Sequence, residues 1–377
     1  MSGQFISLEK TCDFLSGYAW SAANFEADPV GLPIIRIQNV DAVRDSEFVY
    51  WPGEYEERFV VRAGDLLLTL SGSFRAVVWQ GPDALLNQRI VKLTPKPGYS
   101  LDWLLHVLRN GLNTISGLGR HALVSNVALA DLRQLKVPFH TSEEQRRIAA
   151  ILDQAEILRT QRRQALAHLD TLTQSLFLDV LDSAGRDVKK LTVEDGMDAI
   201  IDYRGKTPEK TAQGVPLVTA KVVKNGELLE PDEFIAEDAY DDWMRRGFPE
   251  AGDVLFTTEA PLGEVAQLDG RKVALAQRLL VLRGKSGVLQ NTFLRFALTS
   301  WEVRRQIETR ATGSTVKGIR QKELRQVELP IPPYALQQTF ATRIQAIEAL
   351  KATHRTALAQ LDALFASLQQ RAFAGEL

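Results

Sequence analysis

The chain has 377 residues, of which 45% are hydrophobic and 24% are charged, and its formal net charge is −2. This composition indicates a globular protein of about two domains and excludes a disordered tail or a fibre. The balanced charge gives no global basic field, which excludes a protein that coats nucleic acid non-specifically but leaves room for a locally charged reader of nucleic acid.

The start of the chain carries no recognisable targeting signal. Residues 1–10 lack a basic start followed by a long apolar run, and no stretch reaches the roughly 18 apolar residues that a membrane span needs. Cys12 is the only cysteine, so an internal disulfide and a thiolate-built metal site are excluded, and we expect a small buried side chain rather than a reactive thiol. We therefore expect a soluble cytoplasmic protein without a membrane partner.

The first part of the chain has the pattern of a mixed α/β domain. Residues 65–70, 76–79 and 89–93 are short runs rich in Val and Leu, bounded by Gly or Pro, which predicts strands. Residues 101–110 carry apolar residues at helical spacing. We predict a first recognition domain over residues 1–142.

A long helix follows this domain. Thr141 and Ser142 are capping residues, and the helical pattern then continues to about Leu181 without Pro or Gly, which gives about 39 residues and roughly 58 Å. We predict this helix over residues 143–182. Its apolar seam is Ile151, Ala155, Leu158, Leu169, Leu172 and Leu176.

The second part of the chain repeats this plan. Residues 253–258 and 278–282 predict strands, and residues 291–304 have helical spacing, within a second domain predicted over residues 183–333. A second long helix is predicted over residues 334–377. Its seam is Ile347, Leu350, Leu361, Leu364 and Leu368.

The two parts are an internal duplication. Gly64-Asp65 returns as Gly252-Asp253, and Gln88-Arg89 returns as Gln277-Arg278, at slightly different separations. From residues 131–138, which return as residues 323–330, the separation stays at 192 residues through both long helices. Variable domains attached to a fixed helix explain this difference in spacing.

The two helical seams are each too long to be covered by a small domain. We therefore expect the helices to pair as an antiparallel coiled coil, in which Arg162 and His354 form a polar layer that fixes the register. Two separate amphipathic helices, each lying on its own domain, are the alternative.

The sequence contains partial enzyme motifs, but each lacks a residue that its chemistry needs. Gly-Lys-Thr at 205–207 and Gly-Lys-Ser at 284–286 lack the earlier glycine of a phosphate-binding loop, and Ile331 cannot replace the polar first residue of an amino-methyltransferase Pro-Pro-Tyr loop. The five histidines are scattered, so we expect no metal site and no zinc hydrolase. We expect no catalytic residue, although carboxylates brought together from distant positions would escape this reasoning.

Polar and basic loops remain, and they occur at corresponding places in both halves. Small residues let the backbone approach phosphates, and Arg, Lys, Ser and Asn side chains donate to phosphates or base edges. The candidate DNA-binding residues are Ser71, Ser73, Arg75, Gln88, Arg89, Arg120, His121, Ser125 and Asn126 in the first half, and Arg204, Lys206, Thr207, Lys221, Gln277, Arg278, Ser314, Thr315 and Lys317 in the second.

The order of domain, helix, domain and helix resembles the specificity subunit of type I restriction-modification systems. Arg-Gly-Lys-Thr-Pro at 204–208 and Gly-Ser-Thr-Val-Lys-Gly-Ile at 313–319, ahead of Leu-Pro-Ile-Pro at 329–332, carry the resemblance. It implies two target-recognition domains that each read half of a split, asymmetric DNA site, with an antiparallel helix pair between them. It also implies two modification subunits that use S-adenosylmethionine to methylate adenine, and restriction subunits that use ATP and Mg²⁺, with no cofactor in this chain.

Two other functions stay open at this point. The chain could be a self-contained DNA methyltransferase or nuclease, which binding of S-adenosylmethionine would reveal in the first case. It could also be a coiled-coil adaptor without DNA contact, which would give no complex with duplex DNA at low salt.

Overall fold

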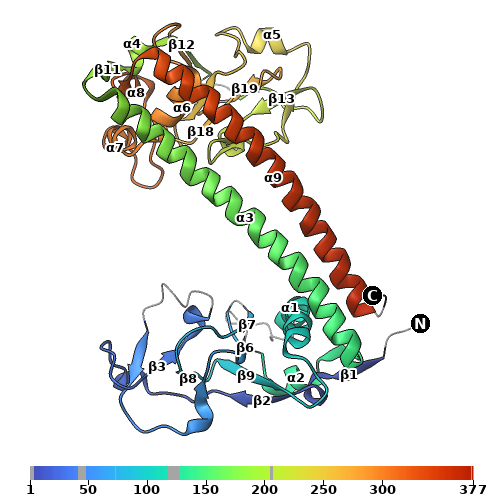
Figure 1. The fold of residues 1–377 in the computed structure, drawn as a ribbon. Coiled ribbons are helices and arrows are strands. Elements are labelled where there is room, and N and C mark those ends of the chain that lie inside the picture. The colour runs from blue at the N-terminus through green and yellow to red at the C-terminus, as the bar shows by residue number, and fades with distance from the viewer. Residues whose placement is uncertain are drawn as a thin grey trace. The chain divides into compact units, whose positions relative to one another are not determined.

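The computed structural model describes residues 4–40, 48–72, 74–117, 127–203, 207–374 and 376, with no side chains described at 112–117. The chain divides into two compact units (Figure 1). Unit 1 comprises Met1–Arg163 and Thr356–Leu377, and unit 2 comprises Gln164–Arg355. Two long helices, α3 (Ser142–Ala184) and α9 (Tyr334–Ala374), each contribute one part to either unit. The division cuts both helices, whereas the predicted domain limits lie at helix ends and stay predictions.

Unit 1 contains two four-stranded sheets. The first is antiparallel in the order β2-β9-β6-β7, and the second has the order β4-β3-β8-β5 with a parallel β3–β8 pair. Strands β1 and β10 form a separate pair next to the long helix. The strands are β1 (Phe5–Ser7), β2 (Cys12–Ser16), β3 (Leu32–Ile35), β4 (Val49–Trp51), β5 (Val60–Val61), β6 (Leu66–Thr69), β7 (Ala76–Val78), β8 (Ala84–Leu86), β9 (Ile90–Pro95) and β10 (Lys136–Pro138), and the helices are α1 (Leu101–Gly117) and α2 (Leu129–Gln134).

Unit 2 repeats this arrangement. Its antiparallel sheet has the order β12-β20-β17-β18, its smaller sheet has the order β16-β13-β19 with a parallel β13–β19 pair, and β11 pairs with β21. A β14–β15 hairpin is additional. The strands are β11 (Lys189–Thr192), β12 (Met197–Asp202), β13 (Val215–Val218), β14 (Val223–Lys224), β15 (Glu227–Leu228), β16 (Phe234–Ile235), β17 (Val254–Thr257), β18 (Val265–Gln267), β19 (Ala274–Leu275), β20 (Leu279–Gly284) and β21 (Glu328–Ile331).

The helices of unit 2 differ from the prediction in one place. They are α4 (Val193–Gly196), α5 (Tyr240–Trp243), α6 (Asn291–Thr299), α7 (Trp301–Arg310) and α8 (Gln321–Arg325). The helix predicted over residues 291–304 is therefore two helices. Ser300 between them is extended, with ψ 149°, and its hydroxyl donates to the carbonyl of Ala297 at 2.7 Å. This side-chain bond satisfies the end of α6 and competes with continuation of the helix.

The long helices form part of the core of each unit. In unit 1, Ile148 and Leu152 from the start of α3 pack with Phe373 from the end of α9 in the cluster beneath the antiparallel sheet. In unit 2, Phe177 from the end of α3 packs with Phe340, 6.1 Å between ring centroids, and Ile344 from the start of α9. Because the start of one helix meets the end of the other in both units, the helices pack antiparallel, as predicted.

The surface that packs between the helices is offset from part of the predicted seam. Ala155, Leu169, Leu176, Ile347, Leu361 and Leu368 are buried or half-buried, and Ile151 is half-buried. Leu158, Leu172, Leu350 and Leu364 are 39%, 46%, 52% and 50% exposed, so their assignment to the seam is wrong. Arg159, Lys351 and Phe365 contact the opposite helix instead, and Thr173, next to Leu172, is buried. Three of these four residues are polar, so hydrophobicity alone missed part of the interface.

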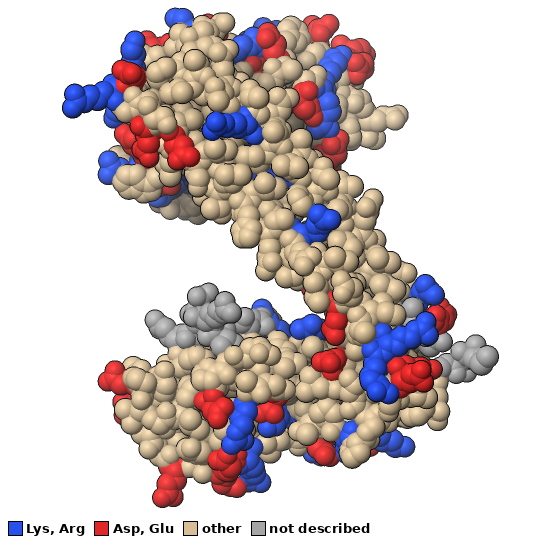
Figure 2. All heavy atoms as spheres, in the orientation of Figure 1, with Lys and Arg blue, Asp and Glu red and all other residues tan. Residues whose placement is uncertain are grey.

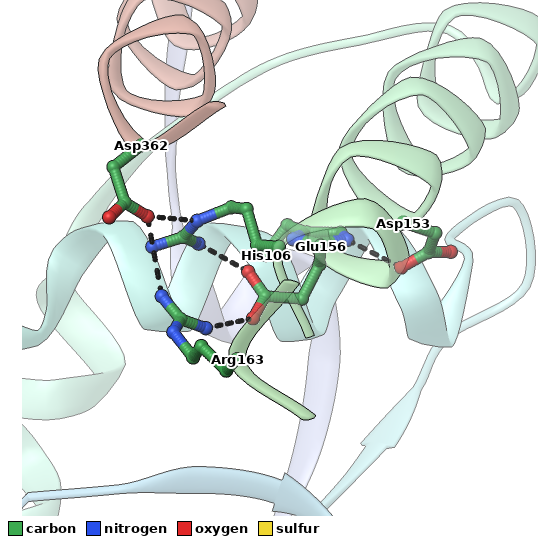
Figure 3. Close-up of polar contacts among 6 residues, drawn as sticks. His106, Asp153, Glu156, Arg163 and Asp362 are labelled. Atoms are coloured by element: carbon green, nitrogen blue, oxygen red, sulfur yellow. Dashed lines mark hydrogen bonds and ion pairs between the residues drawn. The ribbon is translucent and has the colours of Figure 1, made fainter. Parts of the chain in front are cut away.

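Charged side chains occupy that interface at equivalent positions. In unit 1, Arg159 on α3 lies between Glu156 and Asp362, with Nε 2.6 Å from Asp362, and Figure 3 shows these two carboxylates on either side of the arginines. The Arg159 guanidinium also lies over the ring of Phe365. In unit 2, Lys351 on α9 lies 2.8 Å from Asp170 and 3.5 Å from Glu348, and is only 6% exposed. Arg159 and Lys351 are 192 residues apart, as are their acidic partners. The polar layer predicted at Arg162 and His354 stays a prediction.

A buried glutamine attaches each sheet domain to its long helix. The amide oxygen of Gln145 accepts a hydrogen bond from the N–H of Ser100 at 2.9 Å, and its amide nitrogen donates to the carbonyl of His140 at 2.9 Å. Gln337 makes the same bonds with the N–H of Gln290 at 2.9 Å and the carbonyl of Pro332 at 2.8 Å. Both side chains are almost completely buried. We call these two residues the glutamine clamps.

Cys12 is buried, as the sequence predicted. Burial raises the pKa of the Cys12 thiol to about 11, so this side chain stays protonated and inert. Among the described residues, none of the helices is long and apolar enough to cross a membrane.

Candidate nucleic-acid interface

Three corresponding chain segments meet in each unit and form a shallow site that we call the cradle. In unit 1, the N–H of Leu70 donates to the carbonyl of Arg89 at 2.8 Å, and the N–H of Val127 donates to the carbonyl of Leu70 at 3.0 Å. In unit 2, the N–H of Thr258 donates to the carbonyl of Arg278 at 2.9 Å, and the N–H of Ile319 donates to the carbonyl of Thr258 at 2.9 Å. The backbone thus builds the same platform twice.

The unit 2 cradle is centred on Arg278. Its φ is 75°, an unusual backbone conformation for a residue with a side chain, and its side chain is half exposed. The guanidinium Nε lies 2.8 Å from Oε1 of Glu259, which follows Thr258 in the loop after β17. An ion pair held at an exposed, strained position is typical of functional sites.

The loop after α7 closes one side of this cradle. Thr312 and Gly318 pair through their backbones, and Gly318 also pairs with Glu259. Gly313 has φ 113°, and a Cβ there would lie 2.1 Å from the carbonyl oxygen of Val316, so glycine is required. Ser314, Thr315 and Lys317 are exposed between these anchors, where they are free to reach a ligand.

Two pockets flank Arg278. One of 390 Å³ lies between the β17 loop and the loop after α7, and is lined by Glu259, Gln277, Arg278 and Val316 among others. The other pocket has a volume of 350 Å³. Gln277 and Arg278 line it as well, together with the candidates Thr207 and Lys221. The structure thus gathers residues that are up to 71 positions apart in the sequence.

The unit 1 cradle has the same backbone and different side chains. Arg89 is exposed, and its terminal amino group lies 3.4 Å from the hydroxyl of the buried Ser71. Gln88 is exposed beside it, and the exposed Arg75 is held through its N–H, which donates to the Thr69 hydroxyl at 2.9 Å. The candidates that lie outside the described residues are Ser73, Arg120, His121, Ser125, Asn126, Arg204 and Lys206.

Sequence reasoning missed one residue of the unit 2 cradle. Glu259 was not among the candidates, because an acidic side chain is not an expected DNA contact. Leu70 and Thr258 make equivalent backbone bonds, so Glu259 corresponds to Ser71. Arg75 corresponds to Glu264, because the N–H of each donates to an equivalent threonine hydroxyl, that of Thr69 and that of Thr257. The signal was present in the duplication, but the insertions between the halves concealed the register.

The surface charge is mixed on the face drawn in Figure 2. Lys and Arg are interspersed there with Asp and Glu, rather than gathered into one basic surface. Among the described residues, no group of His, Cys, Asp or Glu could hold a metal ion. With a formal net charge of −2, the chain as a whole has no broad basic field.

The sequence is similar to those of type I restriction-modification proteins. Residues 4–168 and 201–363 match the family of the "Type I restriction modification DNA specificity domain". The specificity subunit of the type I restriction enzyme EcoBI from Escherichia coli is 22% identical, over 99% of this chain and 85% of that protein. A putative type I MjaX specificity subunit from Methanocaldococcus jannaschii is also 22% identical, over 86% and 82%.

Comparison with solved structures supports the fold. The S subunit of a type I restriction-modification system from M. genitalium has a TM-score of 0.65 at 12% identity, over 98% of this chain and 96% of that chain. A chain from a study of type I complex assembly has a TM-score of 0.53 at 18% identity, over 100% and 98%. These findings give no support to a self-contained enzyme or to an adaptor. With two matches that together span most of its length, the chain belongs to the type I restriction-modification specificity subunits and has two target-recognition domains.

Proposed function

We propose that the chain reads a bipartite, asymmetric DNA site, with the unit 1 cradle contacting one half-site and the unit 2 cradle contacting the other. The observation that carries this proposal is the repeated backbone platform with different side chains. Ser71 and Arg89 occupy it in unit 1, and Glu259 and Arg278 occupy it in unit 2. One platform carrying two sets of donors and acceptors suits two different base sequences.

The exposed leucines of the long helices support a stoichiometry of two modification subunits. Leu158 and Leu364 belong to unit 1, and their counterparts 192 positions away, Leu350 and Leu172, belong to unit 2. Two equivalent apolar surfaces suit two copies of one partner.

Leu158→Lys with Leu350→Lys is expected to abolish association with the modification subunit in a pull-down. Trp301→Lys, which changes a side chain on α7 that is 74% exposed, is expected to leave it intact.

The chemistry is proposed to lie in the partner subunits. S-adenosylmethionine would bind the modification subunits, and ATP with Mg²⁺ would bind the restriction subunits, all in the cytoplasm, as part of host defence. Titration calorimetry of the purified chain with S-adenosylmethionine is expected to give no heat of binding, and a measurable affinity would return the self-contained methyltransferase to consideration.

The central test is the methylated sequence itself. Sequencing of methylated adenines in a genome that expresses the chain with its modification subunit is expected to reveal one interrupted motif with two unlike halves. A continuous motif, or two identical halves, would contradict one cradle per half-site.

A further inference from the structure

The two cradles hold their arginines in different ways. In unit 2, the nearest approach of Glu259 to Arg278 is Oε1 to Nε at 2.8 Å, and among the described residues the two terminal amino groups of this guanidinium donate no hydrogen bond. In unit 1, Ser71 binds a terminal amino group of Arg89, at a longer distance of 3.4 Å. The carboxylate therefore leaves the forked end of Arg278 intact, whereas the hydroxyl occupies part of the fork of Arg89.

A free fork of two amino groups selects among the bases. Guanine presents two acceptors, O6 and N7, on its major-groove edge, whereas adenine presents one acceptor and one donor, and thymine presents one acceptor. Arginine has donors only, so it makes two hydrogen bonds to guanine and fewer to the other bases.

The charge of Glu259 argues against a simple phosphate contact at this position. A carboxylate 2.8 Å from the guanidinium offsets its positive charge and repels a nearby phosphate. A base edge carries no net charge, so the neutralised pair loses little there and keeps its geometry. Glu259 is itself held, because its backbone pairs with Gly318, where a Cβ would lie 3.1 Å from that of Glu259.

We propose that Glu259 is a positioning residue that presents the two terminal amino groups of Arg278 to a guanine in the half-site of unit 2. The proposal rests on the proposed function, since it requires that the unit 2 cradle contact DNA. Unit 1, which carries Ser71 instead, would discriminate less sharply through Arg89.

The test is a selection from duplexes randomised across the site, using the full chain in complex with its modification subunit. The variants are Arg278→Lys, Glu259→Ser, which copies the unit 1 residue, and Glu259→Gln, which keeps an oxygen of the same reach without the negative charge. Glu237→Gln is the matched control, because it removes a carboxylate paired with Lys272 at the surface of the same unit.

The wild-type complex is expected to prefer guanine at one position by roughly 5- to 150-fold, and Arg278→Lys is expected to remove that preference. Glu259→Ser should lose most of the preference at the same position only, while binding to unrelated duplexes stays equal or becomes tighter. Glu259→Gln should lie between Glu259→Ser and the wild type, and Glu237→Gln should match the wild type.

Three results would overturn the proposal: a full guanine preference in Glu259→Ser, a position lost in Arg278→Lys that is not guanine, or equal weakening at every position in Glu259→Ser. The last result would assign Glu259 a merely structural role. If the wild-type complex selects no motif at all, the proposed function fails, which is a different outcome from loss of one base preference.

Discussion

The two units share a backbone and differ at the point of contact. Both build the cradle from the same three segments, with corresponding N–H groups donating to corresponding carbonyls at 2.8 to 3.0 Å. Around it, unit 1 places a hydroxyl next to its arginine, and unit 2 places a carboxylate. A structure that is held by the backbone tolerates such changes, because the side chains at the cradle contribute little to the core.

The attachment of each cradle to the long helices has not diverged to the same extent. The glutamine clamps make the same bonds in both units, and the acidic and basic residues of the ionic layers occupy equivalent positions. The two units thus share these attachment contacts and differ in the side chains next to the arginine of each cradle. If the two units are equivalent in this respect, matched changes in both should have matched effects.

The largest expected effect comes from removing most of unit 2. A fragment of residues 1–183 lacks Ala372, Phe373 and Asp362, which pack against or pair with the start of α3 in unit 1. Their counterparts on α3 itself are Val180, Leu181 and Asp170, so a second copy of the fragment can supply them. We expect a dimer that, with the modification subunit, methylates an interrupted palindrome of the first half-site and no longer methylates the original motif.

Two measurements check this expectation. Light scattering should give twice the mass of the fragment, and methylated-adenine sequencing should show two inverted copies of one half-site. A stable monomer, or methylation of the original asymmetric motif, would contradict the equivalence of the two helix pairings.

Loss of a glutamine clamp is expected to be the next largest effect. Gln145→Leu leaves the N–H of Ser100 and the carbonyl of His140 buried without their partner, which should lower the free energy of unfolding by roughly 2–4 kcal/mol. Gln337→Leu should cost a similar amount, and Gln154→Leu, at an exposed position of α3, should be close to neutral. Urea unfolding followed by circular dichroism measures all three, and unequal costs for the two clamps would show that the domains are attached differently.

A smaller effect is expected for Lys317, an exposed cation that has no lysine counterpart in unit 1, where Ser125 stands 192 positions earlier. If Lys317 contacts a phosphate, Lys317→Ala should weaken binding to all sequences alike and reduce the salt dependence of the affinity by about one counterion. Fluorescence anisotropy at several salt concentrations measures this slope. The exposed Lys322 on α8 provides the control substitution, and an unchanged slope would remove Lys317 from the interface.

The smallest expected effect is a pH dependence confined to unit 1. His140 accepts a hydrogen bond from Trp103 on Nδ1, and its Nε2 lies 3.0 Å from the carbonyl of Ala372, whereas unit 2 has Pro332 at this position. Burial lowers the pKa of His140 from 6.5. The folded chain then binds this proton less readily than the unfolded chain, so the free energy of unfolding should fall as the pH drops below about 6.5.

The acidic neighbour of His140 titrates at lower pH, which separates the two effects. Hydrogen bonds from Thr141 hold the pKa of Glu144 below 4.5, so this carboxylate stays ionised between pH 5 and 7. Urea unfolding across that range should give a steeper pH dependence for the wild type than for His140→Gln. Equal slopes in the two proteins would show that His140 does not cause the effect.

The sequence by itself determined the duplication, the element types and the two long helices. Repeated segments such as Gly64-Asp65 and Gly252-Asp253 are local in the chain, and strand and helix periodicities are properties of short windows. The strands predicted around residues 65–70 and 253–258 are confirmed as β6 and β17 for this reason. The order of these elements, together with the motifs at 204–208 and 313–319, was sufficient to indicate the family.

The tertiary structure alone decided which helix stripe is buried and which side chains meet in the cradles. Helical periodicity favoured Leu158 and Leu350, but burial depends on the opposite helix, where acidic partners allow Arg159 and Lys351 to lie inside. Glu259 and Arg278 are 19 residues apart and meet only because β17 and β20 are neighbours in the sheet. A sequence specifies such a pair only through the complete packing, because no local pattern records which loops end side by side.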